Sequence, residues 1–233
     1  MQPIDRRTFL MLGAGSLMAA CDSQGPQAAR PVLRFAERKN EKLERVLFRH
    51  TAMDTPDSRR LAGRALPSYH ISRQVPVWDE AVRGRWTLEV SGLVRRPMRL
   101  TQTQLAALPS VEQRVDHYCV EGWTATTMWR GVRLSTLARM AGMTPEAEYV
   151  DFQSFDADYH ESWDLESALH AQTLIAYGWE GGPLTPAHGA PARLHSPVKL
   201  GYKNVKYLTR IVFMPRRNGG YWSDRGYEWY AGV

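Results

Sequence analysis

HYCVEGW, residues 117–123, is the stretch that decides how the rest of the sequence is interpreted. It contains Cys119, one of two cysteines among the 233 residues; the other, Cys21, lies in an N-terminal segment with the pattern of an export signal. An exported domain with one internal thiol cannot form a disulfide within itself. Because a free thiol outside the cytoplasm is open to oxidation, we expect Cys119 to be kept for its chemistry or to be buried as a small hydrophobic residue.

The N-terminus predicts export. The sequence DRRTFL, residues 5–10, contains a twin-arginine pattern, and an apolar run covers residues 9–20. This run is too short to span a bilayer and is typical of a signal peptide. Twin-arginine signals direct the export of proteins that have already folded, often with a cofactor in place. We therefore predict a signal peptide over residues 1–21 and a periplasmic protein.

The end of this segment, LMAAC over residues 17–21, resembles a lipobox, although Met18 departs from the commonest residue at its position. In a lipobox the cysteine is lipidated and becomes the new N-terminus, so Cys21 would anchor the protein to the inner membrane. Asp22 would favour retention there. The alternative is simple cleavage after a small residue, which gives a soluble periplasmic protein.

The composition after the signal peptide sets broad limits. Removing Asp5, Arg6 and Arg7 with residues 1–21 lowers the formal net charge from +6 to +5. This excess could favour an anionic substrate or membrane surface, but no nucleic-acid-binding motif accompanies it. Eight Trp and ten Tyr residues suit an irregular pocket lined by loops.

The pattern of residues divides the mature chain into two parts. Residues 22–66 are expected to form a tether and an amphipathic helix, and residues 67–233 the main domain. The helix is expected over residues 34–50, and packing on the domain is favoured over a membrane-surface role. A loop is expected over residues 54–67.

Alternating apolar and polar residues in the main domain predict short strands. They are expected over residues 86–94, 111–118, 149–155, 173–177, 192–195 and 207–213. Helices are expected after Thr101 and over residues 135–142 and 164–170, with a turn at 181–184. Short strands joined by loops and a few helices indicate an α+β fold with mixed or antiparallel sheets.

The sequence lacks the motifs of several kinds of catalytic and cofactor-binding site. The sequence has no Cys-x-x-Cys pair for redox, iron–sulfur or haem sites, and no glycine-rich phosphate loop. Its seven histidines do not show the spacing of a metalloprotease. Two uses of Cys119 remain: a nucleophile paired with His117 or a distant histidine, and a soft ligand for a metal.

Two segments of the chain carry a family resemblance. The first is CVEGW at residues 119–123, followed by WRGVRL at 129–134; the second is HGAPARL at 188–194, followed by KLGYKNVKY at 199–207. Both segments resemble the sulfite oxidase superfamily. The sequence is most similar to bacterial molybdopterin oxidoreductases, including periplasmic methionine-sulfoxide reductase catalytic subunits. The resemblance covers about residues 67–230.

The resemblance implies a sulfite-oxidase fold that binds molybdenum through one molybdopterin and one cysteine thiolate, which Cys119 matches. Arg193 and Lys206 suit a pterin phosphate, although the lysines at 199, 203 and 206 would without the resemblance be assigned to a solvated surface. The positions matching cofactor-binding residues are Tyr69, His70, Ser154, His188, Arg193, Asn204, Val205 and Lys206.

The C-terminal sequence GYWSDRGY, residues 220–227, resembles a sulfite oxidase segment that contains an active-site tyrosine. Tyr227 would then donate a hydrogen bond to the metal oxo group or to the substrate, and core packing is the alternative. Residues 121–123 depart from the arginine-containing sequence that follows the cysteine in classical sulfite oxidases. The haem and dimerisation domains of those enzymes are also missing, so we expect a monomeric catalytic subunit.

The resemblance implies oxygen-atom transfer to or from a sulfoxide or a sulfite-like compound. No second redox centre is visible in the sequence, so electrons would pass through a partner such as a membrane cytochrome b or a periplasmic cytochrome c. Two alternatives stay open: a cysteine-dependent hydrolase or transferase, and a cofactor-free binding protein with the same fold.

Overall fold

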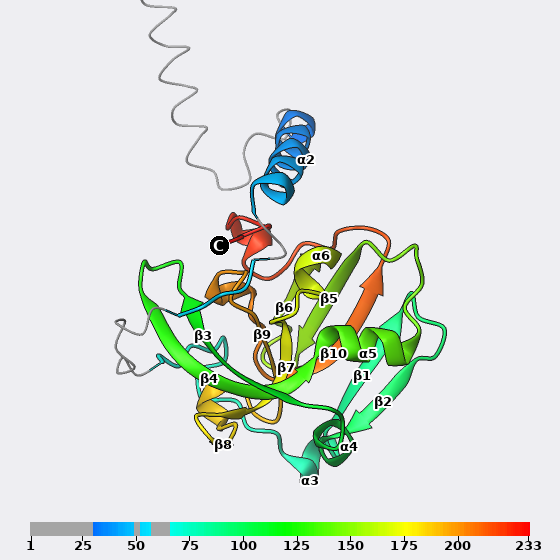
Figure 1. The fold of residues 1–233 in the computed structure, drawn as a ribbon, viewed down its shortest axis with the longest axis vertical. Coiled ribbons are helices and arrows are strands. Elements are labelled where there is room, and N and C mark those ends of the chain that lie inside the picture. Colours follow the sequence, from blue (N-terminus) through cyan, green and yellow to red (C-terminus); the bar gives the residue numbers. More distant parts are fainter. Residues whose placement is uncertain (1–29, 49–51, 57–65) are drawn as a thin grey trace, which may run out of the picture.

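The computed structural model describes residues 30–48, 52–56 and 66–233 (Figure 1). The predicted signal peptide, Cys21 and most of the predicted tether lie outside the described residues. Within the described residues, the strands form two five-stranded sheets joined by short helices. The predicted α+β fold with mixed sheets is therefore confirmed.

The first sheet is mixed, in the order β2-β1-β10-β5-β6. Strand β1 runs parallel to β10, with Val90 opposite Ile211, and the other neighbours are antiparallel. The pairing of β1 with β10 brings the start of the main domain beside its end. The bounds are β1 (Thr87–Gly92), β2 (Met98–Thr101), β5 (Tyr149–Ser154), β6 (His160–Asp164) and β10 (Leu208–Met214).

The second sheet is antiparallel and carries the segment around Cys119. Its order is β3-β4-β7-β8, and β9 also pairs with β7. Strands β3 and β4 form a hairpin whose turn is residues 119–123. The bounds are β3 (Val111–Tyr118), β4 (Thr124–Arg133), β7 (Leu174–Trp179), β8 (Gly182–Pro183) and β9 (Arg193–His195).

The helices begin and end at capping signals in the sequence. Helix α4 (Gln102–Ala106) follows Thr101, whose side chain accepts a hydrogen bond from the Gln104 backbone N–H in a capping box. Helix α5 (Leu134–Ala141) ends at Gly142, which adopts the left-handed conformation with φ of 67°. The other helical segments are α2 (Arg30–Leu47), α3 (Glu80–Arg83), α6 (Leu165–Ala168), η2 (Pro186–His188), η3 (Gly201–Lys203) and η4 (Ser223–Arg225).

The main core lies between the first sheet and the inner face of the second. It includes Leu88 and Phe152 from the first sheet, Leu137 from α5 and Ile175 from β7. A smaller cluster around Trp129 covers the other face of the second sheet. None of the helices among the described residues is both long enough and apolar enough to cross a membrane.

Several elements differ from the sequence-based expectation. Strands β4 and β6 were not expected, and β8 replaces part of the expected turn at 181–184. Strand β6 escapes detection because Glu161, Ser162 and Asp164 are polar yet fully buried, so the strand lacks an alternating apolar pattern. Helix α2 begins at Arg30, inside the segment predicted to be tether.

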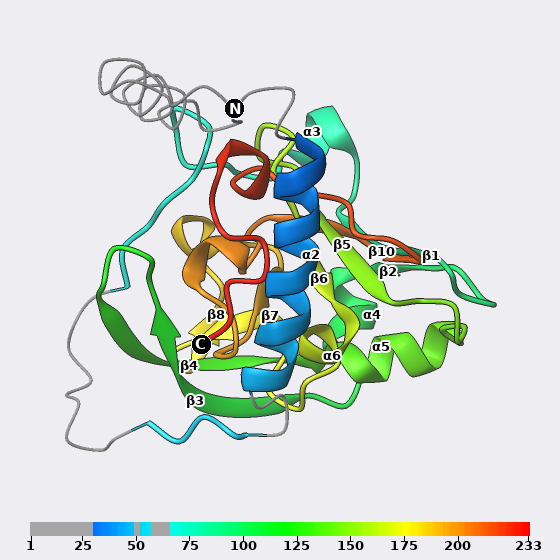
Figure 2. The same ribbon diagram turned by 90° about the horizontal axis from the view of Figure 1, so that it is seen from above.

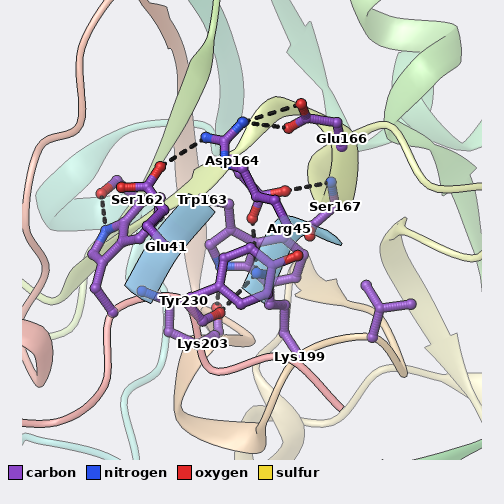
Figure 3. A network of polar contacts seen from close by, with 12 residues as sticks. Glu41, Arg45, Ser162, Trp163, Asp164, Glu166, Ser167, Lys199, Lys203 and Tyr230 are labelled. Atoms are coloured by element: carbon purple, nitrogen blue, oxygen red, sulfur yellow. Dashed lines mark hydrogen bonds and ion pairs between the residues drawn. The ribbon is translucent and has the colours of Figure 1, made fainter. Parts of the chain in front are cut away.

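Two buried lysine–carboxylate pairs explain the polar residues of β6, and Figure 3 shows the one between Lys199 and Asp164. Lys203 Nζ lies 2.6 Å from Glu161 Oε2, and Lys199 Nζ lies 2.7 Å from Asp164 Oδ1. All four side chains are at most 1% exposed. Lys199 and Lys203 are therefore not on a solvated surface, where they would be placed without the family resemblance.

The same pairs bind the C-terminal segment. Glu161 also accepts hydrogen bonds from the Trp222 backbone N–H and the Ser223 hydroxyl, at 2.9 and 3.0 Å. Lys199 Nζ donates to the Tyr230 carbonyl oxygen at 2.7 Å. These further hydrogen bonds offset the free-energy cost of removing the charged groups from water. They also hold residues 222–230 against β6 and η3.

We predict that Lys203→Met strongly destabilises the protein, because it leaves the Glu161 carboxylate buried without its cation. The free energy of unfolding should fall by about 3–5 kcal/mol. Urea unfolding of the cofactor-free protein measures this loss, and Lys42→Met, on the exposed surface of α2, is the matched control with a change of about 0.5 kcal/mol or less. Equal effects of the two substitutions would contradict the structural role of the pair.

Candidate active site

A cavity of about 350 Å³ opens beside the turn of the β3–β4 hairpin and contains Cys119. The Cys119 backbone N–H donates to the Trp123 carbonyl at 2.9 Å, and the Gly122 N–H donates to the Cys119 carbonyl at 3.0 Å. Gly122 has a φ of +83°, a conformation that glycine adopts without strain. This tight turn presents the thiol to a space that residues 66–71 and 193–207 also line.

The Cys119 thiol lies next to a carboxylate. Its Sγ atom is 3.8 Å from Glu121 Oε2, which also accepts hydrogen bonds from the Tyr69 hydroxyl at 2.8 Å and Trp123 Nε1 at 2.9 Å. The bonds from Trp123 and Tyr69 lower the pKa of Glu121, so it stays charged. Partial burial raises the pKa of the Cys119 thiol.

Two basic side chains lie on the inner side of the cavity. Arg193 is 3% exposed and donates to the carbonyl oxygens of His188, Leu194 and Asn204. Burial lowers its pKa to about 10, so it remains charged at neutral pH. Burial, with the charge of Arg193, lowers the pKa of Lys206 to about 7.

Neither Arg193 nor Lys206 forms an ion pair with a carboxylate among the described residues. Buried charges are normally paired, so the inner side of the cavity carries positive charge that a bound anion would neutralise. Tyr207 and His70 also line the cavity, and the Tyr207 hydroxyl and His70 Nδ1 are buried without a hydrogen-bond partner among the described residues.

The structure brings together seven of the ten residues predicted for the site. Asn204 also shapes the loop, because its amide binds the Ser196 N–H and the carbonyl oxygens of Lys199 and Leu200. The seven that line the cavity are Tyr69, His70, Cys119, Arg193, Asn204, Lys206 and Tyr227.

The structure places the other three elsewhere. The His188 ring stacks on Trp179 at 3.9 Å, although its carbonyl oxygen accepts from Arg193 Nη1. Val205 is fully buried in the main core. Ser154 lines a separate hollow on the first sheet, and its hydroxyl accepts a hydrogen bond from the Asp156 N–H.

Sequence reasoning missed several residues of the cavity wall. Glu121 and Trp123 belong to the quoted motif, which could have identified them. Tyr202 lies in the quoted motif of residues 199–207 and in η3, whereas Asp156 and Tyr159 come from a loop without a recognisable pattern; all three line the same cavity.

His117 lines the cavity together with Cys119. Burial lowers its pKa to about 3, so it is neutral, and its Nδ1 lies 3.4 Å from His195 Nε2. Activation of a cysteine nucleophile requires a lowered thiol pKa and an adjacent base. The raised pKa of Cys119 and its contact with Glu121 do not provide this arrangement.

Comparison with known proteins identifies the family. The family model described as "Oxidoreductase molybdopterin binding domain" matches residues 73–222. The chain belongs to this family. The expected relationship to the sulfite oxidase family is thereby confirmed, and the protein is a molybdenum-dependent oxidoreductase with molybdopterin and molybdenum as its cofactors.

Relatives cover most of this oxidoreductase. YedZ1 of Azospira oryzae is named a putative protein-methionine-sulfoxide reductase subunit. It is 36% identical to this chain, and the match covers 97% of this chain and 87% of YedZ1. The uncharacterized oxidoreductase YuiH of Bacillus subtilis is 33% identical over 72% of this chain and 87% of its own. MsrP of Gluconobacter oxydans is named a protein-methionine-sulfoxide reductase catalytic subunit. It is 34% identical to this chain, and the match covers 64% of this chain and 54% of MsrP.

A solved structure shows the same fold. The sulfane dehydrogenase SoxCD from Paracoccus pantotrophus superposes with a TM-score of 0.54 at 24% identity, over 57% of this chain and 39% of that chain. This likeness concerns the fold alone, and it supports the predicted sulfite-oxidase architecture.

The residues of the cavity fit a molybdopterin. Arg193 and Lys206 would hold its anionic phosphate, and the Tyr207 hydroxyl and His70 Nδ1 offer hydrogen-bonding groups that lack a partner. Cys119 would supply a thiolate, a soft ligand that suits a metal whose other ligands come with the cofactor. Within the described residues, no group of three or more His, Cys, Asp or Glu side chains could hold a metal ion.

We predict that Lys206 makes the stability of the cofactor-free protein depend on pH. Its pKa is about 7 in the folded protein and about 10.4 in an unfolded chain. Between these values the unfolded chain keeps a proton that the folded protein has lost, so the free energy of unfolding rises with pH.

Lys206→Met should remove this contribution and flatten the rise between about pH 7 and about pH 10. Thermal unfolding of wild type and variant over this range measures the difference, and Lys42→Met should retain the wild-type slope. Parallel curves for wild type and Lys206→Met would show that Lys206 is not buried in this way.

Proposed function

We propose that this enzyme reduces sulfoxides, with methionine sulfoxide in proteins as the substrate class, at a molybdenum centre ligated by Cys119. Two relatives named as methionine-sulfoxide reductase catalytic subunits, from Gluconobacter oxydans and Campylobacter jejuni, support reduction. When bound, the molybdenum centre supplies oxygen-atom transfer. Reduction of a sulfoxide to a thioether consumes two electrons and two protons and releases water.

The observation that carries this proposal is the distribution of charge around Cys119. The cations Arg193 and Lys206 lie on the inner side, whereas the charged carboxylate of Glu121 is 3.8 Å from Sγ. A carboxylate beside the proposed metal ligand repels an anionic substrate such as sulfite, but it does not repel a neutral sulfoxide.

The mouth of the cavity is apolar and aromatic. Tyr69, Val120 and Tyr227 all line it, and they are 55%, 49% and 41% exposed. This rim suits the methyl and methylene groups of a methionine sulfoxide side chain. The Tyr227 ring packs against Tyr202 and Trp222, at 5.3 and 5.0 Å between centroids. In this proposal its hydroxyl would donate a hydrogen bond to the substrate oxygen.

The proposal includes the cellular setting. The enzyme would be exported by the twin-arginine route, act in the periplasm, be anchored through Cys21, and receive electrons from a membrane cytochrome b or a periplasmic cytochrome c. The cavity walls come from segments as distant as residues 66–71 and 222–227. A cofactor that contacts all these segments can bind only after the protein has folded. This favours an export route that carries folded proteins.

Sulfite oxidation is the second candidate, because Tyr227 lines the cavity as the sulfite oxidase resemblance implies. Reduction of methionine sulfoxide by a reduced dye and oxidation of sulfite by an oxidised dye separate the candidates. The proposal expects turnover with methionine sulfoxide. Turnover with sulfite alone would overturn it.

Cys119→Ser should abolish sulfoxide reduction and strongly lower the molybdenum content, because a hydroxyl is a much poorer soft ligand than a thiolate. Mass spectrometry of the metal in protein purified from a host that makes molybdopterin measures this loss. Ser154→Ala, outside the cavity, is the control and should keep its molybdenum. An active Cys119→Ser enzyme with full metal content would refute the proposed ligand.

Glu121→Gln should shift the preference of the enzyme toward sulfite. Removing one negative charge near the thiolate should raise the ratio of kcat/KM for sulfite to that for methionine sulfoxide by about tenfold, which corresponds to about 1.4 kcal/mol. Steady-state kinetics with both substrates give this ratio. An unchanged ratio would mean that Glu121 does not discriminate against anions.

A further inference from the structure

Helix α2 contacts the domain through its polar side. Arg45 forms ion pairs with Glu41 and with Glu166 of α6, both at 2.9 Å, and the Glu41 carboxylate accepts from the Tyr149 hydroxyl at 3.0 Å. Phe48 follows the helix and packs on Tyr230 at 5.6 Å. Figure 2 shows α2 lying across the domain beside the C-terminal segment, and Figure 3 shows the contacts of Arg45.

The opposite side of α2 is apolar and faces outward. Successive residues of an α-helix lie 100° apart around the helix axis, and on this basis the exposed apolar residues of α2 fall within an arc of about 120°. No element among the described residues covers this face, and an uncovered apolar stripe on a helix marks an interaction surface. Its residues and their exposed fractions are Val32 69%, Phe35 55%, Leu43 57%, Val46 81% and Leu47 65%.

The charges of α2 are sorted in the same way. Its acidic residues turn toward the domain, where Glu37 pairs with Arg217 at 2.9 Å and burial raises the pKa of Glu44 to about 7. The basic residues Arg38, Lys39 and Lys42 are exposed. The outward side therefore combines an apolar stripe with cations, a pattern that binds anionic lipid surfaces.

The position of α2 in the chain limits what can cover it. Eight residues, 22–29, separate Cys21 from the start of the helix. Fully extended, this connection reaches about 30 Å. A chain anchored at Cys21 therefore keeps α2 close to the membrane surface.

We propose that the outward face of α2 binds the surface of an anionic phospholipid bilayer. Val32, Phe35, Leu43, Val46 and Leu47 enter the boundary between headgroups and acyl chains, and the exposed cations contact the headgroups. This second attachment adds to the anchor and orients the enzyme on the membrane. The inference rests on the proposed export and anchoring, but not on the proposed substrate.

A photo-crosslinking amino acid at position 46 tests the proposal in the full-length holoenzyme. The matched control is position 82 on α3, because Val46 and Val82 are 81% and 79% exposed. Each protein is mixed with vesicles of 70% phosphatidylcholine and 30% phosphatidylglycerol and irradiated, and mass spectrometry identifies the adducts. We expect phospholipid adducts at position 46 at about tenfold the yield at position 82, with a lower yield at 1 M salt.

Equal yields at positions 46 and 82 would overturn the proposal. An adduct at position 46 that forms only with a membrane protein, in native membranes and not in pure vesicles, would also overturn it and assign the face to a protein partner. Sulfoxide reduction by the same preparations is measured without vesicles. Failure of the proposed reaction and failure of membrane binding are therefore separate results.

Discussion

The architecture depends on two buried lysine–carboxylate pairs. They join three parts of the chain that are far apart in sequence: β6 supplies Glu161 and Asp164, the region of η3 supplies Lys199 and Lys203, and the C-terminal segment binds to both pairs. Charged groups without contact to water must be satisfied completely, so each pair fixes the geometry of all its partners. This constraint holds in place the loop that contains Asn204 and Lys206 and the segment that contains Tyr227. These two parts of the chain form much of the cavity wall.

The cavity separates its charges between an inner and an outer side. Arg193 and Lys206 lie inside without a paired carboxylate among the described residues, while Glu121 lies beside Cys119 near an aromatic rim. The inner cations suit the anionic end of a molybdopterin, and the outer carboxylate suits a neutral substrate. In the proposed function, the cavity would bind an anionic cofactor on its inner side and select against anionic substrates on its outer side, because the two sides have opposite charge.

The sequence predicted an α+β fold with short strands, and it predicted the part of the site that lies in recognisable motifs. Cys119, Arg193 and Lys206 line one cavity, and the sequence singled out each of them because it lies in a motif whose chemistry is recognisable. Strand β6 was missed because hydrophobic periodicity assumes apolar buried residues, and here the buried residues are charged. A motif also does not give the direction of each side chain: Val205 lies between Asn204 and Lys206 in sequence, yet it points into the main core. Asp156 and Tyr159 reach the cavity only through tertiary folding.

X-ray absorption at the molybdenum edge, on the enzyme purified from a host that makes molybdopterin, tests the central claim most directly. It reports the number of sulfur atoms bound to the metal. The account predicts one sulfur ligand more than the dithiolene of the cofactor provides, and the loss of that sulfur in any metal that Cys119→Ser retains. Dithiolene sulfur alone in the wild-type enzyme, or an unchanged sulfur shell in Cys119→Ser, would contradict the assignment of Cys119 as the protein ligand.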